Sequence, residues 1–304
     1  MSTEVNGDRG SVTPTPHQQP YANGNGTTKP VPGARQKIKV EITSDAICPF
    51  CILGLRYLQQ AIATAQSSDP SSPLAHLDFE LEFKPYLLDP TLTREPIDKR
   101  EKYESRFGKE KFAKMEEMMQ EKARKVGINL VYDGPVSSTH DYHRVLHAAY
   151  AKGGQDIQLP LAERLFSGYF EHQRDPGSRT WLAQEAVASG VFSSIEEANQ
   201  FFQSDTYDAE VKQGYLAARK LGIAGVPFFV FEGKWAVSGA QPPEAFLDIF
   251  EELVKCGCGR TNGAEARSQT ASTETQNGER PAALQAGQNG NGATCGDTNA
   301  MVCG

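Results

Sequence analysis

The sequence predicts an α/β fold that carries an all-helical block in its middle and a disordered tail at each end. A β-α-β pattern begins near residue 37, a β-β-α pattern ends near residue 256, and more than a hundred residues between them show helical periodicity. The tails, residues 1–36 and 257–304, are rich in Gly, Asn, Gln, Ser and Thr and lack apolar periodicity. Such segments cannot bury enough apolar surface to offset the entropy of ordering, so we expect both to be disordered.

Composition excludes several classes of protein. The net charge of −7 over 304 residues argues against a surface that binds nucleic-acid phosphates. No apolar stretch approaches the roughly 18–20 residues that cross a bilayer, and the first thirty residues hold no apolar segment behind a basic start. We therefore expect a cytoplasmic protein that binds neither nucleic acid nor a membrane. Composition leaves the oligomeric state open.

The first half of the fold alternates strand, helix and strand. Residues 37–43, KIKVEIT, alternate apolar with polar side chains and predict a strand. Residues 49–65 place leucine and isoleucine at helical spacing behind Pro49, and proline is favourable in the first turn of a helix. Residues 77–87 alternate again and predict a second strand.

The helical block and the second half of the fold follow. Helices are predicted over residues 109–126, 141–152, 159–172, 180–189, 195–203 and 207–221. Residues 226–231 and 235–237 predict two strands joined by a turn, and residues 243–255 predict a final amphipathic helix. No internal repeat is visible in the sequence.

Cys48-Pro49-Phe50-Cys51 lies at the predicted junction of the first strand and the first helix. This position is typical of redox-active dithiols, because the helix dipole and the unpaired amides favour the thiolate of the first cysteine. The second cysteine, one turn later, can attack a mixed disulfide formed at the first. Half of a zinc site or two core cysteines are the alternatives, but the predicted fold contains no second CxxC to complete a zinc site.

Gly225-Val226-Pro227-Phe228 opens the third predicted strand. Proline cannot donate a hydrogen bond to a strand ladder, so its presence here needs a reason. A trans proline on an edge strand is one explanation, and a cis proline packed beside the dithiol is the other. The upstream CPFC and the β-β-α ending favour the cis proline, since the cis form is accessible mainly at X–Pro bonds.

Four segments carry a resemblance to a known family. They are SDAICPFCILG (44–54), HRVLHAA (143–149), LFSGYFEH (165–172) and GIAGVPFFVFEGKWAVSGAQ (222–241). Together they resemble the DsbA-like thioredoxin-fold group, and within it the FrnE-like oxidoreductases. The resemblance spans residues 37–255 and implies a thioredoxin fold with an inserted all-helical domain. The implied parts are a first half (37–90), a helical insertion (91–221) and a second half (222–256).

The same resemblance implies roles for individual residues. Cys48 would be the nucleophile, Cys51 the resolving thiol and Pro227 the cis proline. The residues implied to contact the substrate are Pro49, Phe50, Val226 and Phe228. The family usually carries tryptophan where this chain has Phe50, so the redox potential or the substrate fit can differ and the preferred direction of reaction stays open.

Two further functions remain open beside thiol–disulfide exchange. Kappa-class glutathione transferases and 2-hydroxychromene-2-carboxylate isomerases share the inserted-helix layout, but they typically carry serine at the position of Cys48. Their glutathione-binding segment also looks different from residues 238–241 of this chain. Because both cysteines of CPFC are retained, a glutathione-dependent transferase or isomerase is the alternative. A non-enzymatic module that holds a ligand or partner in a cleft beside the insertion is the second alternative.

Other cysteine and histidine residues give weaker signals. Four cysteines at the end of the fold or in the tail either form a flexible redox relay to CPFC or are incidental; they are Cys256, Cys258, Cys295 and Cys303. His140, His143 and His147 fall close to one helical face, but no carboxylate completes a metal motif. We expect these histidines to pack or to line a substrate cleft, and we expect no metal site. Asp45 either influences the Cys48 thiolate, shuttles a proton or caps the helix.

The sequence therefore predicts a thiol–disulfide oxidoreductase. Its substrate would be a protein or a small molecule that carries a thiol or disulfide. No bound cofactor is expected, and glutathione could serve as reductant or co-substrate. FrnE-like proteins are associated with polyketide gene clusters, so the resemblance also implies a place in secondary metabolism. The substrate and the electron partner cannot be named from the sequence.

Overall fold

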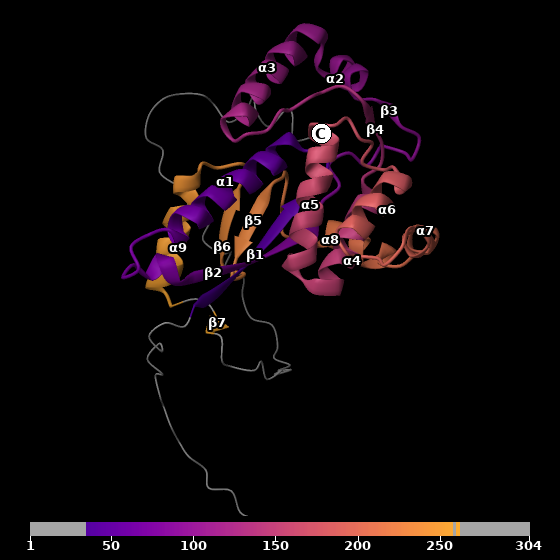
Figure 1. Ribbon diagram of the computed structural model, residues 1–304. Coiled ribbons are helices and arrows are strands. Elements are labelled where there is room, and N and C mark those ends of the chain that lie inside the picture. The colour runs from indigo at the N-terminus through magenta and orange to yellow at the C-terminus, as the bar shows by residue number, and fades with distance from the viewer. Residues whose placement is uncertain (1–34, 258–259, 262–304) are drawn as a thin grey trace, which may run out of the picture. The chain divides into compact units, whose positions relative to one another are not determined.

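The structure is a computed structural model that describes residues 35–257 and 260–261. Nearly all of both predicted tails, with Cys258, Cys295 and Cys303, therefore lies outside the described residues. The described chain is built around one mixed β-sheet with helices packed against it (Figure 1).

The sheet joins the two predicted halves of the fold. Its strand order is β2-β1-β5-β6, with β1 parallel to β2 and antiparallel to β5, and β5 antiparallel to β6. The strands are β1 (Gln36–Ser44), β2 (Leu77–Pro85), β5 (Phe228–Phe231) and β6 (Trp235–Ser238), and β7 (Arg260–Thr261) pairs with the start of β1. The β-α-β and β-β-α patterns of the sequence thus meet at the β1–β5 pair.

Helices α1 (Pro49–Gln66) and α9 (Pro243–Lys255) cover one face of this sheet (Figure 1). Aromatic rings connect α9 to the strands, because Phe250 lies 4.5 Å from Phe79 and Phe246 lies 5.1 Å from Phe229, measured between ring centroids. Such aromatic contacts contribute about 0.5–1.5 kcal/mol beyond the area they bury. Packing on this face places the N-terminal end of α1 next to β5.

The helices between β2 and β5 form the predicted helical block. They are α2 (Lys99–Phe107), α3 (Lys109–Lys125), α4 (His140–Gly153), α5 (Gln155–Phe170), α6 (Arg179–Ala188), α7 (Ile195–Gln203) and α8 (Asp208–Lys220). Helix α5 runs along the outer side of β2, where the Gln158 side chain accepts a hydrogen bond from the Phe83 amide at 2.8 Å and Gln155 accepts one from the Leu81 amide at 2.6 Å. The block is therefore fastened to the sheet edge by side chains.

Several element boundaries differ from the predictions. Helix α5 begins at Gln155 rather than at residue 159 and contains Pro160 in its interior. Strand β5 begins at Phe228 rather than at residue 226, because the preceding Val226–Pro227 segment packs against α1 instead of joining the ladder. The predicted strand 77–87 ends at Pro85.

Several short elements were not predicted. Helix α2 begins where the Asp98 carboxylate accepts a hydrogen bond from the Glu101 amide, and it buries only two of its side chains. The two-residue strands β3 (Ile97–Asp98) and β4 (Pro135–Val136) pair with each other inside the block, and η1 (Pro73–His76) is a single 3-10 turn before β2. The two-residue strands and the 3-10 turn are too short to produce a periodic pattern, and the nine residues of α2 carry no apolar stripe.

Candidate active site

Cys48 is the residue that caps the N-terminus of α1. Its backbone is extended, with φ −89° and ψ 111°, and Pro49 follows as the first helical residue. The Cys51 amide donates a hydrogen bond to the Cys48 carbonyl at 2.9 Å, which sets the two cysteines one helical turn apart. Both are free thiols, and they are 0% and 2% exposed, respectively. The first amides of a helix lack intrahelical partners, which favours a thiolate at this position.

The loop before β5 lies against the dithiol. The Cys48 sulfur donates a hydrogen bond to the Val226 carbonyl at 3.2 Å, and the Val226–Pro227 peptide bond is cis, as the sequence predicts. Helix α1 approaches this loop closely at Gly54, where a Cβ atom would lie 2.8 Å from the Pro227 side chain and 3.0 Å from Phe229. A glycine is therefore required at this position for the two segments to touch.

The four residues implied to contact a substrate surround the dithiol, but not all are accessible. Pro49 and Val226 are buried, whereas Phe50 and Phe228 are half-buried. The Phe50 ring lies 5.9 Å from the Lys122 ammonium of α3, so the helical block reaches the CPFC turn. Substrate contact by these residues stays a prediction, and Phe50 and Phe228 have the exposed surface for it.

Cys51 is held as a protonated thiol. Burial raises the pKa of its thiol well above the ordinary value, and the hydrogen bond to Cys48 and the charge of Cys48 raise it further. The backbone amide of Asp45 also contacts this sulfur and acts in the opposite direction, whereas the charge of the Asp45 carboxylate raises the pKa again. A thiol in this state needs a base before it can act as a nucleophile.

Asp45 precedes Cys48 by three residues, its carbonyl accepts a hydrogen bond from the Cys48 amide at 3.3 Å, and its carboxylate lies near a histidine from the helical block. One carboxylate oxygen, Oδ2, accepts a hydrogen bond from the Leu88 amide at 2.7 Å. The other, Oδ1, lies 3.5 Å from His143 Nε2 of α4, and the two side chains are 0% and 3% exposed. The carboxylate does not cap α1, so that alternative for Asp45 is wrong. Sequence reasoning considered Asp45 and His143 separately and did not pair them.

The charge of Asp45 acts on four buried tyrosines. Burial is the main cause that raises the pKa of each phenol, and the negative charge of Asp45 adds to the rise. They come from four different helices: Tyr103 from α2, Tyr142 from α4, Tyr169 from α5 and Tyr215 from α8. The sequence analysis did not single out these residues. Only the two that lie next to or within the segments carrying the family resemblance, Tyr142 and Tyr169, had any signal.

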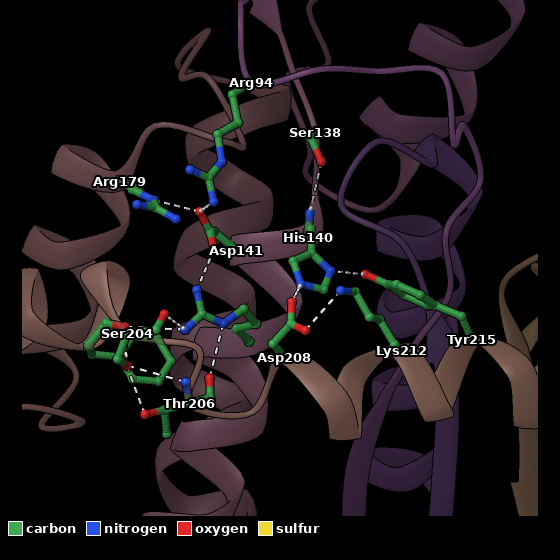
Figure 2. Close-up of polar contacts among 12 residues, drawn as sticks. Arg94, Ser138, His140, Asp141, Arg179, Ser204, Thr206, Asp208, Lys212 and Tyr215 are labelled. Carbon is green, nitrogen blue, oxygen red and sulfur yellow. Dashed lines mark hydrogen bonds and ion pairs between the residues drawn. The ribbon is translucent and has the colours of Figure 1, made fainter.

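The other two histidines of α4 have different surroundings. His140 Nδ1 lies 3.2 Å from the Tyr215 hydroxyl and His140 Nε2 lies 2.9 Å from Asp208 Oδ1 (Figure 2). The His147 ring packs on Tyr207, with 4.6 Å between ring centroids. Within the part of the chain that the structure describes, no group of three His, Cys, Asp or Glu side chains is arranged to hold a metal ion. Each of the three histidines contacts an aromatic side chain of the helical block.

A second buried carboxylate, Asp141, lies on α4 one turn from Arg144. Its Oδ1 accepts a hydrogen bond from Arg144 at 2.7 Å, its Oδ2 accepts one from Arg179 at 2.6 Å, and Arg94 lies 3.6 Å from Oδ2 (Figure 2). Burial alone would raise the pKa of this carboxyl, but the hydrogen bonds from Arg179 and Arg144 outweigh burial and lower it. Arg144 also donates to the carbonyls of Phe201 in α7 and of Ser204 and Thr206 in the loop before α8.

The predicted redox relay is only partly within the described residues. Cys256 is the C-terminal cap residue of α9, and its backbone amide donates to the Glu252 carbonyl at 3.0 Å. Cys258, Cys295 and Cys303 lie outside the described residues. The relay therefore stays a prediction.

Comparison with known proteins identifies what this arrangement is similar to. Residues 39–251 match the DSBA-like thioredoxin domain family. A probable DsbA oxidoreductase from Streptomyces coelicolor is similar in structure, with 26% identity, a TM-score of 0.62, and coverage of 78% of this chain and 95% of that one. A proposed protein disulfide isomerase from Nitrosomonas europaea has 17% identity and a TM-score of 0.50, with 73% and 99% coverage.

A cytosolic disulfide reductase from Pseudomonas aeruginosa is more distant, with 15% identity, a TM-score of 0.46, and coverage of 72% of this chain and 99% of that one. No curated protein matches the sequence. The family match and the observed sheet confirm the predicted thioredoxin fold with inserted helices. Among the helices of the described residues, none has both the length and the apolar character needed to span a bilayer.

Proposed function

The chain belongs to the DSBA-like thioredoxin domain family, and we propose that it catalyses thiol–disulfide exchange through Cys48 and Cys51. One observation carries this proposal. Cys48 caps the N-terminus of α1 with its sulfur 3.2 Å from the Val226 carbonyl, and Cys51 follows one turn later as a free thiol. Two thiols so placed form a disulfide with each other without a large movement of the backbone.

In the reducing direction, the Cys48 thiolate attacks one sulfur of a substrate disulfide. A bond forms between Cys48 and that sulfur, the substrate S–S bond breaks, and the other sulfur leaves as a thiolate. Cys51 then loses its proton and attacks the Cys48 sulfur, so that the Cys48–Cys51 disulfide forms and the second substrate sulfur leaves. Two electrons have passed from the dithiol to the substrate. The oxidising direction is the reverse of these steps.

A thiol must restore the dithiol after each reductive cycle. We propose glutathione for this role: two glutathione molecules give up two electrons, reduce the Cys48–Cys51 disulfide and leave as glutathione disulfide. The helix N-terminus at Cys48 favours the thiolate leaving group in the exchange. A protein or small-molecule disulfide is the substrate class, and a place in polyketide-type secondary metabolism stays a prediction that rests on resemblance alone.

The burial of Cys48 sets a condition on this chemistry. Its sulfur is covered in the described structure, so a substrate disulfide reaches it only after nearby side chains move aside. Phe50 and Phe228 are the half-buried members of the predicted substrate-contact residues, so we propose that their side chains take part in this movement.

The test is reduction of insulin by dithiothreitol, and reduction of glutathione disulfide, with four forms of the full chain. These are the wild type, Cys48→Ser, Cys51→Ser and a control in which Cys256, Cys258, Cys295 and Cys303 are all replaced by serine. We expect Cys48→Ser to lower the rate to background and Cys51→Ser to accumulate a mixed disulfide detectable by mass. The control should keep the wild-type rate if the outer cysteines are incidental.

Two outcomes would contradict the proposal. Activity that survives Cys51→Ser and consumes glutathione stoichiometrically would indicate the glutathione-dependent transferase or isomerase. Absence of exchange in every form, with no mixed disulfide at Cys48, would indicate that the dithiol is not a catalyst and that the fold serves as a binding module.

A further inference from the structure

A lysine of the helical block faces the CPFC turn. The ammonium group of Lys122 lies 5.9 Å from the centroid of the Phe50 ring, and Phe50 is two residues from Cys48. Helix α3, which carries Lys122, packs beside the start of α1 (Figure 1). The Lys122 side chain is therefore held, half-buried, at the edge of the candidate active site.

Lys122 has apolar neighbours on its own helix. Residues three and four positions apart are neighbours on a helix surface, and for Lys122 three of these four are Met118, Met119 and Val126. Met119 is buried, whereas Met118 and Val126 are half-buried and pack against the hydrophobic core. An ammonium group at such an apolar edge loses part of its hydration, so an apolar side chain would be less costly there.

The carboxylates of the described residues do not balance the charge of Lys122. Among the residues that the structure describes, no Asp or Glu side chain forms an ion pair with it. Its fourth neighbour on the helix, Lys125, holds Glu121 at 2.9 Å. The Phe50 ring supplies the weak attraction of an aromatic face for a cation. A carboxylate from outside the chain would give the ammonium group the counter-charge that it lacks.

We propose that Lys122 binds a carboxylate of a low-molecular-weight anionic disulfide while Cys48 attacks one of its sulfur atoms. This inference rests on the proposed function and names the substrate class of the same site. The proposed reductant, glutathione, belongs to this class because each molecule carries carboxylates. The chain has a net charge of −7, which repels anions at long range, so a cation beside the dithiol has to offset that repulsion.

The contact with Phe50 indicates how the cation becomes available. When the Phe50 side chain moves aside to admit a substrate, Lys122 exchanges the aromatic ring for the carboxylate. An ammonium–carboxylate contact is charge-assisted and therefore stronger than the contact with a ring. The flexible stem of lysine lets its charge follow carboxylates at different positions, which suits a class of substrates rather than one molecule.

The test uses three disulfides of similar size that differ in their end groups. Dithiodipropionate ends in carboxylates, hydroxyethyl disulfide in hydroxyls and cystamine in ammonium groups. Each is mixed with the pre-reduced full chain under single-turnover conditions. The dithiol gives two electrons to the reagent, which leaves as two thiols, and the Cys48–Cys51 disulfide forms. Acid quench, alkylation and mass analysis of the peptide that contains residues 48–51 measure the rate.

The neutral reagent is the internal reference. The three reagents differ in intrinsic reactivity, so the rate of each variant is divided by the wild-type rate with the same reagent. A loss shared by all three reagents then reports a change in the Cys48 thiol itself. A loss confined to the anionic reagent reports a lost contact with its carboxylate.

We expect Lys122→Gln and Lys122→Met to lower the rate with the anionic reagent about fivefold relative to the neutral one, at the upper end of what exposed ion pairs contribute. Lys122→Glu adds repulsion to the lost attraction, so it should lower this relative rate about 25-fold and raise the relative rate with cystamine. Lys122→Arg should keep the wild-type preference, because the charge remains. Salt at about 0.5 M should weaken that preference, since it screens charges.

Lys125→Gln is the matched control. Lys125 lies three residues from Lys122 on the same helix, is 69% exposed and pairs with Glu121. The substitution removes the same formal charge from α3 outside the site. It should therefore leave all three relative rates within about twofold of the wild type.

Three results would overturn the proposal. An equal loss with all three reagents in Lys122→Gln would mean that Lys122 acts on the Cys48 thiol alone. Unchanged relative rates in both Lys122→Gln and Lys122→Glu would mean that Lys122 does not contact the substrate. An equal shift in Lys125→Gln would mean that the overall charge of α3 selects the substrate.

Two further outcomes stay distinguishable. If Lys122→Glu does not fold, as judged by circular dichroism, Lys122→Met decides, because it keeps the apolar edge of α3. Failure of the proposed function would appear in the wild type, which would form no Cys48–Cys51 disulfide even with the neutral reagent. A wild type that forms this disulfide, with Lys122 variants that keep its preference for the anionic reagent, would contradict the role of Lys122 alone.

Discussion

Two buried aspartates lie at helix α4, one on the helix and one against it, and their hydrogen-bond partners differ. Asp141, on the helix itself, accepts short hydrogen bonds from Arg144 and Arg179, and Arg94 lies nearby. Asp45, reached from α4 through His143, accepts one backbone hydrogen bond at Oδ2, and within the described part of the chain its Oδ1 accepts none. Both carboxylates are nearly inaccessible, at 5% and 0% exposed. Burial alone therefore does not distinguish them.

The difference teaches how a buried charge is used. A carboxylate surrounded by guanidinium groups keeps its charge, so it can hold segments together but cannot exchange a proton near neutral pH. At Asp45 the contacts are instead an imidazole nitrogen 3.5 Å from Oδ1 and one backbone amide at Oδ2. Asp141 therefore stabilises the helical block, whereas Asp45 has fewer interactions that would stabilise the fold. Four predictions test this division.

The largest effect should follow from Asp141→Asn. The substitution leaves Arg144 and Arg179 buried or half-buried without their counter-charge, and breaking such a network costs about 3–5 kcal/mol of the free energy of unfolding. Urea unfolding measures it. Asp208→Asn, in the half-exposed pair with His140, is the matched control and should cost at most about 1 kcal/mol. Equal losses of unfolding free energy in Asp141→Asn and Asp208→Asn would contradict a special structural role for Asp141.

Acid should reduce the loss of stability that Asp141→Asn causes. The pKa of Asp141 is lowered in the folded chain, so its contribution is fully present above the unfolded value of about 3.9 and is lost as the pH falls through the folded value. We therefore expect the gap in free energy of unfolding between wild type and Asp141→Asn to shrink from pH 5 to pH 3. Urea unfolding at both pH values checks this, and a gap that widened in acid would contradict it.

Removal of the Arg179 guanidinium should lower the free energy of unfolding less than removal of the Asp141 carboxylate. Arg179→Gln leaves Asp141 with Arg144, and Arg179 is about a third exposed, so we expect a loss of about 1 kcal/mol. Arg164→Gln is the matched control, since Arg164 pairs with Glu185 at the same 2.6 Å but is 51% exposed. Thermal unfolding of both should rank Arg179→Gln below Arg164→Gln in stability.

The smallest change in stability should come from Asp45→Asn. The asparagine oxygen can still accept from the Leu88 amide, and the variant removes a buried charge that has few compensating partners. We expect the free energy of unfolding to stay within about 1 kcal/mol of the wild type. A loss of 3 kcal/mol or more in urea unfolding would place Asp45 with Asp141 as a structural residue.

Much of the fold could be predicted because its elements carry local patterns. Helices α7 and α9 begin and end where their periodicity predicts, and the alternating residues of β1 and β2 mark strands with one apolar face. Helix α2 was not predicted because its sequence, KREKYESRF, contains only two aromatic residues and no apolar stripe. Its start depends on the cap at Asp98, which is a single side chain rather than a pattern.

The candidate site likewise has a part that could be predicted from the sequence and a part that could not. CPFC and Val226-Pro227 could be located from the sequence because a helix start and a strand start are local signals. The contact of Asp45 with His143 joins residues almost one hundred positions apart. Periodicity indicates which face of a helix is buried, but it does not indicate which side chain lies across from it. That information arises only when the helical block packs on the sheet.

The glutamine side chains of α5 have a further consequence for β2. Gln155 and Gln158 occupy hydrogen-bonding positions along this strand that the backbone of a neighbouring strand would otherwise take. Gln158 also donates to the Phe83 carbonyl at 3.3 Å, so its amide group satisfies both backbone groups of one residue. Exposed strand edges are templates for aggregation between chains. By covering this edge with side chains, the helical block protects the β2 side of the sheet from edge-to-edge association during and after folding.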